Sequence, residues 1–149
     1  MNDYLSIINP NAVVVDVEAK NKEEVFTYAS HLLSDAGVLT DVDGFKKDLY
    51  YRESLGATGI GGGVAIPHGK SKFVENTCIA IIKLRDYIEW ETVDEKPVKV
   101  LIMFAVSEED KTNNFLRMMA QVARKLANEE VCKNLISAQT PAELMGALS

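Results

Sequence analysis

The chain of 149 residues is long enough to bury a substantial core and has the size of one domain, which we expect to span residues 1–149. Its net charge of −6, with no basic stripe, argues against a nucleic-acid partner. The longest apolar run, residues 100–106, is too short to cross a bilayer, and the first residues lack the pattern of a secretory signal. We therefore expect a cytoplasmic protein without direct membrane insertion.

The first half of the chain predicts one strand and two helices. Residues 12–17 are rich in β-branched side chains, which favour a strand. Asn21 followed by Glu24 is typical of a helix start, and Gly37 is expected to end that helix. A second helix is expected over residues 41–53.

The second half predicts a sheet covered by further helices. The apolar residues 98–106 are typical of a central strand. Two shorter strands are expected before it in the sequence. The expected strands are residues 64–66, 78–84 and 98–106, and the expected helices are residues 113–127, residues 130–137 and one that opens at Thr140-Pro141-Ala142-Glu143. Because strands and helices do not alternate strictly, we expect an α/β (α+β) fold with a mixed sheet of about five strands flanked by helices.

Cysteine and histidine are scarce in this chain. Cys78 and Cys132 lie far apart and form no Cys-x-x-Cys pair, so both are expected to be buried and reduced. His31 lies within a predicted amphipathic helix and is expected to be an ordinary, partly exposed helix residue. With His68 as the only other imidazole, a zinc site would need scattered ligands, and we expect neither a metal nor a cofactor.

The segment GIGGGVAIPHGKS, residues 59–71, has the composition of a phosphate-binding loop but not its spacing. A P-loop needs a glycine five positions before Gly69, where this chain has Val64. The dinucleotide pattern that begins at Gly59 also requires a third glycine at position 64. Both nucleotide-binding interpretations therefore fail, although the glycines still leave backbone N–H groups that can point at an anion.

The tripeptide Pro67-His68-Gly69 indicates a histidine held on a rigid backbone. Pro67 fixes its own φ angle and favours an extended Ile66. Gly69 removes a side chain beside the imidazole, so a large partner can approach. The arrangement suits a nucleophilic histidine reached by another protein; the alternative is a buried histidine satisfied by hydrogen bonds.

The stretch from Arg52-Glu53-Ser54-Leu55 through Gly61 to Val64-Ala65-Ile66-Pro67-His68-Gly69 resembles the enzyme IIA domains of the sugar phosphotransferase system, fructose/mannitol type. The resemblance covers essentially the whole chain. It implies that His68 accepts a phosphoryl group from phospho-HPr and passes it to a cysteine of a IIB component during sugar uptake, with a fructose-like sugar. It also implies that Arg52 stabilises the phosphoryl group, as its charge suits. Alternatively, Arg52 is a surface residue paired with Asp48 or Glu53.

This sequence departs from the pattern of the enzyme IIA domains at their second histidine, where it has Phe115. A phenyl ring cannot donate a hydrogen bond to a phosphoryl oxygen. Asn114, or Asn113, is a candidate substitute through its side chain or its backbone N–H. The departure also leaves open a regulatory domain whose phosphorylation state controls a partner protein. A hydrolase that uses His68 as a general base lacks a Gly-x-Ser-x-Gly motif.

Overall fold

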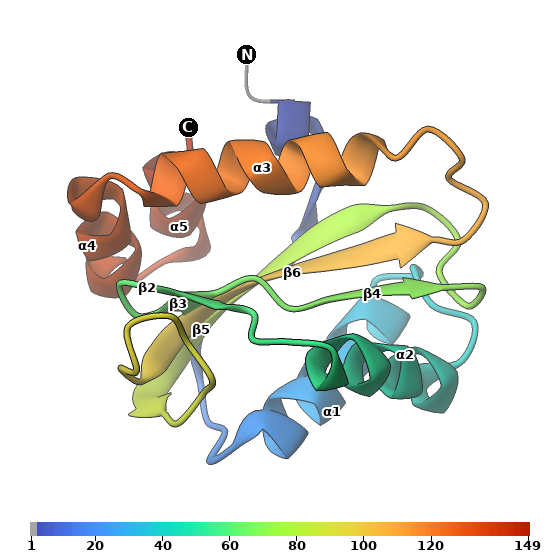
Figure 1. Ribbon diagram of the computed structural model, residues 1–149, viewed down its shortest axis with the longest axis horizontal. Coiled ribbons are helices and arrows are strands. Elements are labelled where there is room, and N and C mark those ends of the chain that lie inside the picture. The colour runs from blue at the N-terminus through green and yellow to red at the C-terminus, as the bar shows by residue number, and fades with distance from the viewer. Residues whose placement is uncertain (1–2) are drawn as a thin grey trace.

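The computed structural model describes residues 3–149 and has a mixed β-sheet between two layers of helices (Figure 1). A short 3-10 helix, Asp3–Ile7, precedes the first strand. The strands are β1 (Ile8–Val17), β2 (Gly59–Gly61), β3 (Val64–Ala65), β4 (His68–Ser71), β5 (Cys78–Ile88) and β6 (Val98–Ser107). The helices are α1 (Lys22–Asp35), α2 (Val42–Ser54), α3 (Asn114–Leu126), α4 (Glu129–Ser137) and α5 (Pro141–Ala147). The predicted fold class is confirmed.

Strand β6 is the centre of the sheet, as its apolar sequence predicts. The strand order is β1-β5-β6-β3-β2, and β4 pairs with β6 beyond the end of β3. β5 and β6 are antiparallel, whereas β3 and β4 both run parallel to β6. Along one edge of β6, β3 therefore pairs with the first part of the strand, and β4 pairs with its last part.

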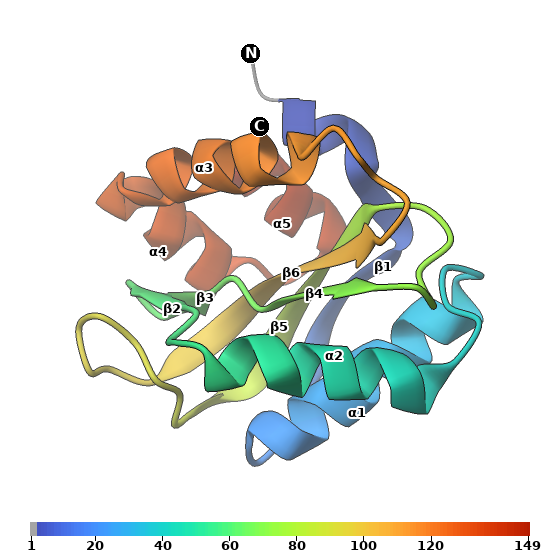
Figure 2. The same cartoon turned by 45° about the vertical axis from the view of Figure 1, so that its right-hand side comes forward.

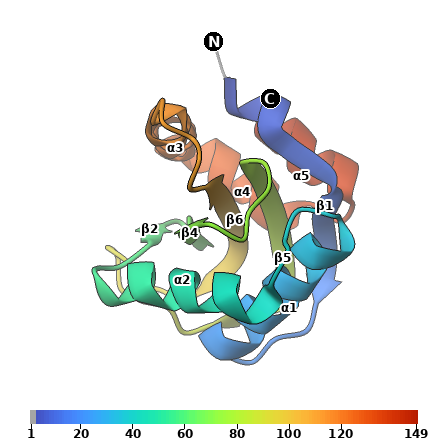
Figure 3. The same cartoon turned by 90° about the vertical axis from the view of Figure 1, so that its right-hand side faces the viewer.

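The two faces of the sheet carry separate hydrophobic cores. Helices α1 and α2 cover one face, and α3, α4 and α5 cover the other (Figures 1 and 3). Alternate residues of the central strands point into opposite layers, so Ile82 packs with Phe26 and Leu49, whereas Ile81 packs in the layer of Val122. Both faces of β6 and of residues 78–84 of β5 are thus largely shielded from water.

The predicted helix ends are confirmed at both ends of the chain. Asn21 accepts a hydrogen bond from the backbone N–H of Glu24 at 2.9 Å, and Gly37 follows α1 with a φ of 79°. Thr140 caps α5 in the same way, accepting from the N–H of Glu143 at 3.1 Å. These short-range signals placed the helices to within one or two residues.

Two short strands were missed, and two longer ones extend beyond their predicted limits. β2 and β4 contain mostly glycine and polar residues, so their sequence carries no strand signal. β1 begins at Ile8 rather than at residue 12, and β5 continues to Ile88 because that residue pairs with Val98 of β6. The sheet therefore has six strands instead of about five.

Cys78 and Cys132 are buried free thiols, and His31 is exposed on α1, as predicted. Burial raises the pKa of the Cys78 thiol to about 11. Within residues 3–149, none of the helices combines the length and the apolar character needed to span a bilayer.

Candidate functional site

Gly69 determines how closely helix α2 approaches strand β4. A Cβ atom added to this glycine would lie 3.3 Å from the backbone nitrogen of Leu49 and 3.3 Å from a ring carbon of Phe45. The missing side chain therefore lets α2 lie along β4 (Figure 2). Arg52 is three residues beyond Leu49 and so lies on the same side of α2. This packing brings Arg52 to His68, the residue before Gly69.

His68 is half-buried, and both of its ring nitrogens have partners. Arg52 Nε donates a hydrogen bond to His68 Nε2 at 3.1 Å, and His68 Nδ1 lies 3.3 Å from the carbonyl oxygen of Ile66. A carbonyl can only accept and a guanidinium can only donate, so the proton of the neutral ring is on Nδ1. Nε2 is therefore the unprotonated nitrogen, and its lone pair accepts the hydrogen bond from Arg52.

The surroundings of His68 favour its neutral form. Burial lowers the pKa of this imidazole, and the Arg52 guanidinium lowers it further. The Ile66 carbonyl and the Glu53 carboxylate act in the opposite direction but do not reverse the shift. A neutral imidazole with an unprotonated nitrogen is the form that can act as a nucleophile.

The backbone on both sides of Pro67 is fixed by hydrogen bonds. The N–H of Ile66 donates to the carbonyl of Thr58 at 2.9 Å, and the carbonyl of Pro67 accepts from the N–H of Phe104 at 3.0 Å. The turn at Pro67 is thus anchored to β6 and to the segment before β2. This agrees with the expectation that His68 is presented on a rigid backbone.

The glycines before His68 form the turn of the β2–β3 hairpin. Gly61, Gly62 and Gly63 all have positive φ angles, which the tight turn between β2 and β3 requires. The N–H of Gly62 donates to the carboxylate of Asp94 at 3.1 Å. The Gly62 N–H therefore does point at an anion, but the anion is a side chain of the same protein, so this N–H is not available to a ligand.

A polar network that the sequence analysis missed surrounds Glu53, the residue after Arg52 in α2. Lys22 forms an ion pair with Glu53 at 2.8 Å, and the hydroxyl of Thr58 donates to the same carboxylate. Trp90 Nε1 donates to the Thr58 hydroxyl at 3.0 Å, and the Lys22 ammonium lies 4.6 Å from the centre of the Trp90 ring. The network ties the end of α2 to the start of α1. No signal in the sequence paired these four residues, of which only Glu53 and Thr58 are close along the chain.

Arg52 does not pair with either of the carboxylates considered for it. The Glu53 carboxylate is taken by Lys22 and Thr58, and Arg52 donates to His68 and, through Nη1, to the carbonyl of Gly56 at 3.1 Å. The alternative of a surface arginine paired with Asp48 or Glu53 is therefore wrong.

The first turn of α3 carries the two residues that the sequence analysis considered in connection with the missing histidine. Phe115 is 8% exposed, and the ammonium of Lys70 lies 5.6 Å from the centre of its ring. Asn114 is exposed; its backbone N–H donates to the hydroxyl of Thr112 at 3.4 Å, and its side chain makes no hydrogen bond within residues 3–149. Asn113 precedes the helix with a φ of 56°.

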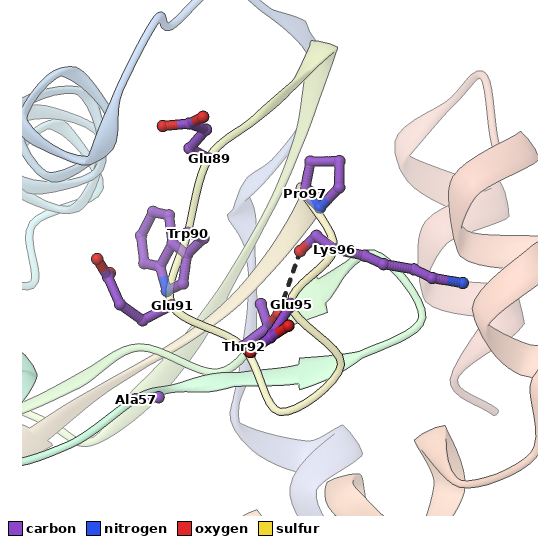
Figure 4. A pocket seen from close by; sticks show the side chains of 8 residues that line it. All are labelled: Ala57, Glu89, Trp90, Glu91, Thr92, Glu95, Lys96 and Pro97. Carbon is purple, nitrogen blue, oxygen red and sulfur yellow. Dashed lines mark hydrogen bonds between the residues drawn. The ribbon is translucent and has the colours of Figure 1, made fainter.

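Two surface hollows are lined by other parts of the chain. One, of about 660 Å³, lies between the β2–β3 hairpin and helix α4. The other, of about 590 Å³, lies beside Trp90, where the loop is closed by the Thr92 hydroxyl donating to the Lys96 carbonyl at 3.1 Å (Figure 4). Its lining includes three carboxylates, those of Glu89, Glu91 and Glu95, which makes it unsuitable for a phosphate group. Neither hollow includes His68.

Comparison with protein families gives one family model that matches residues 6–149, described as "Phosphoenolpyruvate-dependent sugar phosphotransferase system, EIIA 2". The "PTS system fructose-specific EIIABC component" of Bacillus subtilis is 32% identical over 90% of this chain, which spans only 21% of the length of that relative. The "Nitrogen regulatory protein" of Klebsiella oxytoca is 32% identical over 93% of this chain and 85% of its own length.

Solved structures with the same fold cover almost the whole chain. The nitrogen regulatory protein IIA-Ntr from Neisseria meningitidis superposes with a TM-score of 0.82 at 27% identity, covering 97% of this chain and 98% of that one. A complex of enzyme IIA-mannitol with phosphorylated enzyme IIB-mannitol from Escherichia coli gives a TM-score of 0.75 at 19% identity, covering 93% and 94% of the two chains.

Proposed function

This chain belongs to the EIIA 2 family of the phosphoenolpyruvate-dependent sugar phosphotransferase system, and we propose that His68 is the residue on which it carries a phosphoryl group. The observation that supports this most strongly is the pair of contacts to the ring. Nδ1–H is held by the Ile66 carbonyl, and Nε2 faces the guanidinium of Arg52. Nε2 is thus the unprotonated nitrogen that can form a new bond once Arg52 releases it, and it already lies next to a cation.

The proposed step is an in-line displacement at phosphorus. The lone pair of His68 Nε2 attacks the phosphorus of a phosphohistidine on the donor, the donor's P–N bond breaks, and its electron pair returns to the donor imidazole. The His68 ring becomes positive as the new bond forms. The Ile66 carbonyl, which accepts from Nδ1–H, stabilises that charge. Transfer onward to a cysteine thiolate repeats the displacement with His68 as the leaving group.

Arg52 has a different role before and after transfer in this proposal. In the free protein its Nε–H occupies the Nε2 lone pair, so this hydrogen bond must break as phosphorus approaches. The guanidinium then rebinds the phosphoryl oxygens, which accept more strongly than the neutral imidazole nitrogen does. Because a phosphoryl oxygen replaces Nε2 as the acceptor, breaking the Arg52–His68 hydrogen bond costs little free energy. The charge is stabilised without a metal, so transfer from purified phospho-HPr is expected to continue in EDTA.

We propose that Asn114 takes the role of the second histidine, which this chain lacks, as a hydrogen-bond donor to the phosphoryl group. Its exposed amide at the start of α3 makes no hydrogen bond within residues 3–149, so its N–H groups are available to a phosphoryl oxygen. If Asn114→Ala leaves the phosphorylation of His68 unchanged, this role is excluded.

The proposed partners are HPr as donor and a IIB component as acceptor, in a cytoplasmic step of sugar uptake. The name of the Bacillus subtilis relative joins A, B and C components and gives fructose as the sugar, which supports a fructose-like sugar for this chain. The complex with phosphorylated enzyme IIB involves a protein of the same fold. The position of His68 outside both described hollows fits an acceptor presented to another protein rather than to a small molecule.

A regulatory role is the second candidate, because the Klebsiella oxytoca nitrogen regulatory protein matches this chain over 85% of its own length. Incubation with enzyme I, HPr and phosphoenolpyruvate tests the shared step. An acid-labile phosphoryl group is expected on the wild type and not on His68→Ala, whereas an unmodified wild type contradicts the proposal. Addition of a fructose-type IIB protein then separates the two roles: transport predicts rapid loss of the group to the IIB cysteine, and regulation predicts that it stays.

A further inference from the structure

Lys70 is an exposed cation near His68 without an acidic partner. None of the carboxylates of residues 3–149 lies within 4.0 Å of its ammonium, which instead lies over the ring of Phe115 at 5.6 Å from the ring centre. The charge of Lys70 is felt by the Asp110 carboxylate, whose pKa is lowered by hydrogen bonds from Thr112 and, more weakly, by Lys70. The Asp110 carboxylate is held in its own turn by Thr112.

Strand geometry places Lys70 on the same face of β4 as His68. Successive side chains of a strand alternate, so Gly69 and Ser71 point to the opposite, buried side, where Gly69 meets α2. Residues two apart lie roughly 6.6 Å from each other along a strand. The flexible side chain of Lys70 can cover that distance, and the contact with Phe115 holds its ammonium only weakly in its present position.

We propose that Lys70 is a second cation that binds the phosphoryl group on His68, from the side opposite to Arg52. The inference rests on the proposed function of His68 and deepens it. A phosphoryl group carries two negative charges and three acceptor oxygens, more than one guanidinium satisfies. Arg52 reaches Nε2 from helix α2 and also holds the carbonyl of Gly56, which leaves the α3 side of the group without a cation from α2. Lys70 is on that side.

The first test measures the phosphoryl group itself, in the absence of any partner protein. In a His31→Asn background, His68 is the only histidine, and potassium phosphoramidate phosphorylates it chemically: the P–N bond of the reagent breaks, ammonia leaves, and the ring nitrogen gains the phosphoryl group. A ³¹P NMR titration then gives the pH at which that group loses its last proton. A nearby cation favours the dianion and lowers this pH.

Lys70→Gln is expected to raise that titration midpoint by about 0.5–1 pH unit, and Lys70→Arg to keep it close to the wild type. Lys72→Gln is the matched control. Lys72 is also exposed, lies over a phenyl ring (Phe73, 5.2 Å from the ring centre), and its substitution changes the net charge equally. Its midpoint is expected to match the wild type. Identical midpoints for Lys70→Gln and the wild type would overturn the proposal.

The second test measures transfer from phospho-HPr. Lys70→Gln is expected to accept the phosphoryl group roughly tenfold more slowly, and Lys72→Gln within about twofold of the wild-type rate. An equal loss in both variants means that the lysines attract HPr only through net charge, which contradicts the proposal. If phospho-HPr does not phosphorylate even the wild type, the proposed function fails, while the titration of the chemically phosphorylated protein still decides the role of Lys70.

Discussion

Arg52 donates its Nε–H to Nε2 of His68 across 3.1 Å, so the guanidinium occupies the lone pair that a phosphoryl acceptor needs. The same contact keeps the ring in one tautomer and places a cation where a phosphoryl group would arrive. The site of the free protein is thus closed by a hydrogen bond that a better acceptor, the phosphoryl oxygen, can replace. In the proposed function, phosphoryl acceptance by His68 depends on how easily this one hydrogen bond is exchanged.

Removal of the Arg52 guanidinium is expected to slow phosphorylation of His68. A charged hydrogen bond to the transferring group contributes about 1.5–3 kcal/mol, so Arg52→Met should lower the rate of transfer from phospho-HPr roughly 10- to 100-fold. Arg52→Lys keeps the charge but loses the planar fork, and an intermediate rate is expected. Arg124→Met, which removes an exposed cation from the last turn of α3, is the control. Wild-type rates for Arg52→Met would contradict the assigned role.

The pH dependence of the site follows from the lowered pKa of His68. In a His31→Asn background, the imidazole NMR signal is expected to titrate below pH 6.5, because burial and then the Arg52 charge oppose protonation. Phosphoryl acceptance should therefore persist below pH 6.5 and decline only when the folded protein takes up the proton. Arg52→Met should move the midpoint upward. A midpoint at or above 6.5 in the Arg52-containing protein would show that the ring is not held neutral.

The same shift links His68 to stability. The unfolded chain binds the proton near pH 6.5, whereas the folded chain binds it only at lower pH. The unfolded state therefore holds more protons between these two values, and the contribution of His68 to stability is lost as the pH falls through this window. Urea unfolding of the wild type and of His68→Gln at several pH values measures this contribution as a difference in the free energy of unfolding, which is constant above pH 6.5 and changes against the wild type as the pH falls through this window.

Loss of the Glu53 carboxylate is expected to destabilise the fold. Its side chain is 7% exposed and joins Lys22 to Thr58, so Glu53→Gln leaves the Lys22 ammonium with only the exposed carboxylate of Glu91. We expect a loss of about 1–3 kcal/mol in the free energy of unfolding by urea. Arg85→Met removes an exposed cation that pairs with Asp16 and Glu18, and it should leave the urea midpoint unchanged. An equal effect of the two substitutions would show that the network is no more than a surface ion pair.

A methyl group at position 69 is expected to separate helix α2 from strand β4. Gly69→Ala would put its Cβ 3.3 Å from the backbone of Leu49, which cannot move without the helix. We expect about 1–3 kcal/mol of destabilisation and slower phosphorylation even where the protein is fully folded, because Arg52 moves away from His68. Gly146→Ala, in open space within α5, should instead stabilise the protein by roughly 0.5–1 kcal/mol. A Gly69→Ala protein with normal stability and activity would show that the packing is not tight.

Local signals in the sequence were enough to predict the helices and the long strands. A capping residue such as Asn21 or Thr140 acts over three or four positions, and the structure has the same contacts. Strands β2 and β4 could not be predicted in this way. Gly69 and Lys70 have low strand propensity, and they are extended only because β6 offers them a partner. Strand pairing of this kind depends on the tertiary fold.

The candidate site was also predictable from the sequence only in part. The pattern around Pro67 singled out His68, and the resemblance to a known family singled out Arg52, which the structure brings into contact. The partners of Glu53 and the position of Lys70 over Phe115 depend on how α1, α2 and α3 pack, and no spacing in the sequence reports that. These contacts between neighbouring elements therefore had to come from the structure.

Strand β4 has a further consequence for the behaviour of the protein at high concentration. Among residues 3–149 it pairs with β6 alone, so its outer side is an open sheet edge to which a second copy could add a strand. The edge is only four residues long, follows a proline and carries an exposed lysine, three features that discourage such addition. The segment that carries His68 is therefore also protected against self-association, and apolar replacements in it are expected to reduce solubility before they unfold the domain.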